Sequence, residues 1–134
     1  MSQAAIRAAL ETALDAMSPA LATAWENVAF TPPVSTVPYQ RAFLLFATPV
    51  NPDMGRGVTR ESGIFQINLC YPLQAGDGAA RARVALLRDT FYRSATFVSG
   101  STKVIMRNTP EAGAGAASGD RWIVPVKCIF FADI

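Results

Sequence analysis

The fold is decided by the stretch Gly63-Ile-Phe-Gln-Ile-Asn-Leu-Cys-Tyr-Pro-Leu73, followed by Gln74-Ala-Gly-Asp-Gly78 and Ala79-Ala-Arg-Ala-Arg-Val-Ala-Leu-Leu-Arg-Asp-Thr-Phe-Tyr-Arg93. Large apolar side chains stand at every second position from Phe65 to Tyr71, which predicts a strand with one face on the core. After the glycines, apolar residues recur at three- and four-residue steps, which predicts an amphipathic helix. This unit supplies packing and almost no reactive groups, so it indicates a protein that works by fitting another surface.

Other stretches have the patterns of regular structure. Apolar residues from Ile6 to Met17 predict a helix, and Ser18-Pro19 ends it because proline disfavours helical backbone in the residue before it. Residues 20–25 are interpreted as a short turn or a further piece of helix. Further strands are expected at 41–48, 101–108 and 121–131, and the Gly-, Ala- and Ser-rich residues 109–120 are interpreted as a flexible loop.

The expected order of elements is therefore α-β-β-α-β-β. Two hairpins separated by a helix favour an α+β fold: a single domain over residues 1–134, with a mostly antiparallel sheet of about four strands and two helices packed on one face. The strand at 41–48 carries apolar residues on both faces, which predicts that it is central or covered on both sides. Residues 49–61 form a long hairpin tip, and so long a loop usually has a function or is disordered.

The composition is apolar-rich and charge-poor. Of the 134 residues 51% are hydrophobic and 16% are charged, so apolar surface is expected to lie against other subunits, although a well-packed monomer is the alternative. The net charge is +2, and the arginines of the helix at 78–93 point in several directions. A nucleic-acid binder usually shows a clustered basic stripe, so this pattern argues against one.

Reactive groups are scarce. The chain has no histidine, which removes the commonest general base and most zinc sites. Its two cysteines, Cys70 and Cys128, stand far apart in apolar runs and are interpreted as buried thiols. We therefore expect no catalytic residue, no cofactor site and no metal site. The N-terminus lacks the pattern of a signal peptide and no apolar run is long enough to span a membrane, so a reducing cytoplasm is expected and no membrane partner.

Several motifs in order resemble one known family. They are Trp25-Glu-Asn-Val-Ala-Phe-Thr-Pro-Pro33, Tyr39-Gln-Arg-Ala-Phe-Leu-Leu-Phe46, Gly63-Ile-Phe-Gln-Ile-Asn-Leu-Cys-Tyr-Pro72, the helix after Gly76-Asp-Gly78, Phe91, Phe97 and Arg121-Trp-Ile-Val-Pro-Val126. The set is similar to the tail-terminator proteins of long-tailed phages, the group that includes the terminator of lambda. The resemblance implies an α+β structural protein without catalysis. It also implies a ring of six copies that caps the tail tube, fixes the tail length and provides the surface that joins the head.

The resemblance implies partners but no residue motif for them. The expected partners are further copies of the chain, the tail tube protein and a head-completion protein, with passive contact to DNA in the lumen. The expected location is the host cytoplasm during assembly and then the virion tail of a phage or prophage. The residues proposed for interfaces, from the loop, the polar side of the second strand and the outward side of the second helix, are Arg56, Arg60, Gln66, Asn68, Leu86 and Arg88.

Three other functions stay open at this point. The chain could be another head–tail connector or neck protein, which differs in the end of the tail and the partner that it binds. It could be a small enzyme or ligand-binding α+β domain, which would need a deep pocket lined by several carboxylates. It could also be a nucleic-acid-binding module, which would need the arginines of residues 81–93 on one exposed face.

Overall fold

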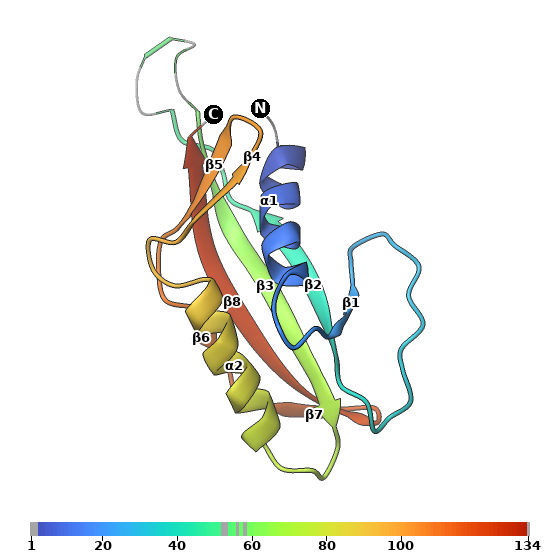
Figure 1. Ribbon diagram of the computed structural model, residues 1–134. Coiled ribbons are helices and arrows are strands. Elements are labelled where there is room, and N and C mark those ends of the chain that lie inside the picture. The colour runs from blue at the N-terminus through green and yellow to red at the C-terminus, as the bar shows by residue number, and fades with distance from the viewer. Residues whose placement is uncertain (1–2, 52–53, 56, 58, 134) are drawn as a thin grey trace.

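The computed structural model describes residues 3–51, 54–55, 57 and 59–133. Two helices and eight strands follow one another along this part of the chain (Figure 1). In order, they are α1 (Gln3–Asp15), β1 (Ala22–Ala24), β2 (Tyr39–Phe46), β3 (Arg60–Pro72), α2 (Gly78–Thr90), β4 (Thr96–Ser99), β5 (Thr102–Met106), β6 (Glu111–Ala112), β7 (Ala116–Ser118) and β8 (Arg121–Asp133).

The strands form one curled, mixed sheet. Its order is β1-β2-β3-β8-β5-β4, and β6 and β7 also pair with β8. All pairings among these strands are antiparallel except that of β1 with β2, which is parallel. The longest pairing joins β3 and β8 over all 13 residues of each strand.

The expected sheet of about four strands in the order α-β-β-α-β-β is wrong. The four expected strands exist as β2, β3, β5 and β8, but β1, β4, β6 and β7 were missed. Each missed strand has two to four residues, too few for a period of two to stand out from a loop. Residues 20–25 contain β1 instead of a turn or helix, and the Gly-rich loop 109–120 contains β6 and β7.

One face of the sheet packs against both helices, as expected (Figure 1). Phe65 of β3 and Phe130 of β8 are buried there, and Phe91, just after α2, lies 5.8 Å from the Phe65 ring and 5.2 Å from the Phe97 ring. Each such side chain stabilises the fold by roughly 1.5–3 kcal/mol through its burial. We call this side of the sheet the inner face and the opposite side the outer face.

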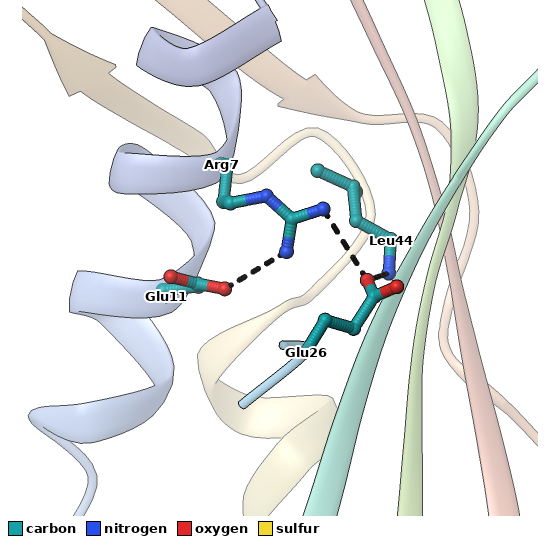
Figure 2. Close-up of polar contacts among 4 residues, drawn as sticks. All are labelled: Arg7, Glu11, Glu26 and Leu44. Atoms are coloured by element: carbon teal, nitrogen blue, oxygen red, sulfur yellow. Dashed lines mark hydrogen bonds and ion pairs between the residues drawn. The ribbon is translucent and has the colours of Figure 1, made fainter. Parts of the chain in front are cut away.

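Helix α1 is fixed to the sheet by its apolar stripe and by an ion-pair network. Ile6, Leu10 and Leu14 are buried against the inner face. Arg7 donates to Glu11 at 3.2 Å and to Glu26 at 3.3 Å, and Glu26 in turn accepts the backbone N–H of Leu44 in β2 at 2.6 Å (Figure 2). The carboxylate thereby satisfies a donor that β2 would otherwise leave open beyond the short partner β1.

Helix α2 is tied to β8 through Asp77. This residue occupies the N-cap position but makes no side-chain capping bond. Its carboxylate accepts instead from Arg81 Nε at 2.6 Å and from Trp122 Nε1 at 2.8 Å. These two bonds lower the pKa of Asp77 below its ordinary value, with the Arg81 bond the larger cause. The helix ends at Thr90, before the predicted end at Arg93.

Residues 27–38, which we call the arm, connect β1 to β2 and loop away from the sheet (Figure 1). Buried Arg121 holds the base of the arm, because its guanidinium donates to the carbonyls of Val37, Pro33 (2.8 Å) and Val34 (2.9 Å). The same guanidinium lies 4.8 Å from the centre of the Tyr39 ring. The arm therefore covers one end of the outer face, which explains why Tyr39 and Cys70 are buried there.

Candidate assembly surfaces

The other end of the outer face carries apolar side chains over which the described residues form no second layer. We call this region the bare face and define it by Phe43, Leu45, Ile64, Ile105, Ile129 and Phe131. Register places Leu45, Ile64 and Ile129 in one cross-strand row, and Phe131 opposite Ile105. Leu45 is 51% exposed. The prediction that the strand at 41–48 is central or covered on both sides is therefore met only in part, since β2 has neighbours on both edges but a bare outer face.

Polar side chains around the bare face contact other residues of the sheet. Gln66 Nε2 donates to Asn68 Oδ1 at 3.0 Å, on the same strand. Arg60 makes two bonds to Asp133, at 2.7 and 3.0 Å, and these lower the pKa of that carboxyl. The guanidinium of Arg60 also lies 4.9 Å from the centre of the Phe131 ring, and that of Arg107 lies 5.4 Å from it.

The predicted interface residues do not form one surface. Arg60, Gln66 and Asn68 share the outer face, with Arg60 in β3 rather than in the loop. Leu86 and Arg88 lie on α2, on the other side of the sheet. Leu86 packs partly buried against the core instead of pointing outward, and Arg88 Nε donates to the carbonyl of Pro110 at 3.0 Å. Arg56 lies outside the described residues.

Sequence reasoning missed the apolar residues that make up the bare face and most of the basic residues around it. The pattern of β8 could have predicted this face, because the strand has apolar residues at both inner and outer positions, with Ile129 and Phe131 on the outer side. A strand with one solvated face would show polar residues there.

Carboxylates do not gather into an acid-lined cleft in the described part of the chain. A hollow of about 520 Å³ beside α1 is lined by both Glu11 and Glu26, but Arg7 pairs with each of them. Among the described residues no group of three histidine, cysteine, aspartate or glutamate side chains could hold a metal ion. The described residues thus form no deep pocket lined by several carboxylates, which a small enzyme or ligand-binding domain would need.

The arginines of α2 do not form one basic stripe. Arg83 is 3% exposed and donates to the carbonyl of Pro19, while Arg81 is bound to Asp77. Arg88 donates to the carbonyl of Pro110. The arrangement required for a nucleic-acid-binding module, with these side chains on one exposed face, is therefore absent from α2.

Both cysteines are buried free thiols. Burial raises the pKa of Cys128 to about 12, and burial is also the main cause that raises the pKa of Cys70. Both thiols are thus protonated near neutral pH, where they are poor nucleophiles. The interpretation of these residues as buried thiols is confirmed.

Comparison with known proteins decides the family. A family model described as phage tail terminator protein matches residues 5–130. The chain belongs to this family. This chain also resembles a solved structure whose name states no function, with a TM-score of 0.80 and 30% sequence identity. The match covers 98% of this chain and 96% of the chain in the solved structure. The comparison of this chain with curated proteins found no significant match.

The resemblance to tail terminators is thereby confirmed. This family is structural rather than enzymatic, and its members are components of the phage tail. Neither helix in the described ranges of the terminator chain has the length and apolarity to cross a membrane.

Proposed function

We propose that this protein closes into a ring of six copies on the end of the phage tail tube. The ring stops the addition of tube protein, so it fixes the tail length, and its free side provides the surface that joins the head. The observation that carries this proposal is the family match over residues 5–130.

The surface of the chain supports the proposal. The bare face offers apolar area that the described residues of one copy leave partly uncovered, and large exposed apolar patches mark contact sites between proteins. A ring needs a head-to-tail contact, in which one patch meets a different patch on the neighbour and the rotation closes. A chain with different surfaces on its helix side and on its outer sheet face can form such a contact.

The proposed partners are further copies of the chain, the tail tube protein and a head-completion protein. DNA that passes through the lumen makes only passive contact. Assembly takes place in the host cytoplasm, and the finished ring remains in the virion tail. Arg56 stays a candidate contact to the tube, on the grounds of its place in the segment between β2 and β3.

Electron microscopy of the purified protein mixed with tail tubes of the same phage tests this function. We expect rings or densities on one end of each tube, and tube length that no longer grows when free tube protein is added. Tubes without this protein, supplied with the same tube protein, are the control. Tubes that keep growing in its presence would contradict the proposal, and binding only to isolated heads or necks would favour a connector protein instead.

A further inference from the structure

The bare face is left partly uncovered by the described residues of its own chain. The arm covers the outer face most fully around Tyr39 and Cys70, which are 6% and 0% exposed, and its Val28 and Phe30 reach the edge of the bare face, where they line a hollow with Phe43. Farther along the same strands Leu45 is half exposed and Ile64 and Ile129 are partly exposed. An antiparallel sheet that faces water on one side normally carries polar residues there. A second surface is therefore expected to pack on this region.

The charges around the bare face select the kind of surface that fits. Apart from Arg121, which is bound to the arm, strand alternation and register place five basic and two acidic side chains on the outer face: Arg41, Arg60, Lys103, Arg107 and Lys127, and Glu111 and Asp133. Contact surfaces tend to have complementary charge. The cover should therefore be apolar or small in its centre and acidic around it.

Of the two helices, only α1 has this charge. The sequence of α1 holds one basic and two acidic residues, whereas that of α2 holds three basic residues and one acidic. Glu26, which packs beside α1, adds a further carboxylate. Arg7 is shared between Glu11 and Glu26, so the surface at α1 keeps an acidic excess (Figure 2).

Asp15 stands out within this surface. It is exposed, and its carboxylate makes no hydrogen bond or ion pair with any residue in the described part of the chain. It is also the last residue of α1, where the helix dipole disfavours a negative charge. The carboxylate of Asp15 therefore does not stabilise the fold of a single copy.

The shape of the α1 surface also fits. A shallow hollow of about 320 Å³ lies between α1 and β4, and small side chains line its helix side: Ala8, Ala9, Thr12, Ala13 and Ala16. Small side chains let another surface approach the helix closely. Leu45 projects from the bare face and has the size to enter such a hollow.

We infer that the bare face of one copy packs on the α1 surface of the next copy, with Asp15 facing the basic side chains around it. Because α1 lies on the inner side of the sheet and the bare face on the outer side, no copy can make this contact with itself. The contact is head-to-tail, as a ring requires. This inference rests on the proposed ring and names its subunit interface.

The size of the contact indicates when it forms. A helix of 13 residues is about 20 Å long and about 10 Å wide, so its footprint is on the order of 200 Å². Stable complexes bury about 800 Å² on each partner. A single pairwise contact is thus weak, and the tube end and ring closure add the further contacts that hold six copies together.

Two charge variants test the interface. Asp15→Lys makes the α1 surface basic, and it favours the helix because a cation suits its C-terminal end. Lys103→Glu with Arg107→Glu makes the bare face acidic. We expect each variant alone to need at least tenfold more protein for half-maximal capping of tubes. The matched control is Asp89→Lys, which makes the same change near the end of basic α2 and should cap tubes normally.

A mixture of the two variants gives the sharpest result. In an alternating ring the acidic bare face of one variant meets the basic α1 surface of the other, and the remaining contacts have the original charges. We expect a one-to-one mixture to cap tubes within about threefold of the original protein. Circular dichroism and thermal unfolding of each variant establish that it folds.

Normal capping by Asp15→Lys would overturn the inference, and so would a mixture of two folded variants that fails to recover. In both cases the original protein still caps tubes, so the proposed function survives. If the original protein neither caps tubes nor forms rings, the proposed function and this interface both fall.

Discussion

Replacement of Arg121 by alanine should release the arm and destabilise the fold. The guanidinium donates to the carbonyls of Val37, Pro33 and Val34 and packs on the Tyr39 ring. Alanine removes all four contacts at once. All three carbonyls belong to the arm, so the part of the arm that approaches the sheet loses its attachment.

The magnitude follows from the number and kind of these contacts. A hydrogen bond to a charged group contributes about 1.5–3 kcal/mol, but carbonyls in a surface loop can bind water once the arginine is gone. We therefore expect a loss of about 2–4 kcal/mol, the range for a broken buried network. For a chain of this size the melting temperature should fall by roughly 8–15 °C.

Thermal and urea unfolding measure the loss, and brief digestion of the native protein with chymotrypsin measures exposure of the arm at Phe30. Arg121→Lys is the control, because it keeps the charge but cannot reach three carbonyls with a single ammonium group. It should lose about half as much as the alanine variant. An alanine variant within about 1 kcal/mol of the original protein, with the arm equally protected, would refute the role of Arg121.

Three further predictions concern the sheet. Gly63→Ala should lower the free energy of unfolding in urea by about 3 kcal/mol or prevent folding, because the new Cβ would stand 2.1 Å from a backbone carbonyl oxygen of β2. The control is Gly78→Ala, whose new Cβ meets no atom within 4 Å, so its stability should be unchanged or higher. Cys128 should resist a thiol reagent at pH 8 until denaturant is added, and fast labelling of the native protein would show that its burial is wrong. Arg60 lowers the pKa of Asp133, so the small stability from this exposed pair is present above the ordinary carboxyl pKa of about 4 and disappears as pH falls through the lowered value. In urea unfolding, Asp133→Asn should therefore be slightly less stable than the original protein at about pH 7 and match it near about pH 2.

The long elements could be predicted from the sequence because their patterns repeat several times. Phe65, Ile67 and Leu69 show the period of β3, and Ile6, Leu10 and Leu14 show the face of α1. The inner face of the sheet and its contact with both helices follow from these patterns. The family resemblance depends on the same stretches.

The remaining features depend on contacts between distant residues. β6 and β7 are strands only because β8 supplies an edge for them, and their own two or three residues carry no pattern. Leu86 faces away from the core stripe on a helical wheel, yet the neighbouring structure half buries it. The sequence pattern puts Arg60 in the loop before β3, because the residue that binds its side chain, Asp133, lies 73 residues away and leaves no local signal.

The position of β8 in the sheet determines the order in which the protein can fold. This strand pairs along one edge with β3 and along the other with β7, β6 and β5, yet the ribosome makes it after all of them. Until residues 121–133 leave the exit tunnel, the strands made earlier have no central partner and their apolar sides stay open. The sheet is therefore completed only after this strand is made, and folding is slow for a chain of this length, since its main pairing spans distant residues. Host chaperones should meet the nascent chain during this delay, and a tag or truncation that disturbs the last strand should abolish soluble protein rather than merely weaken it.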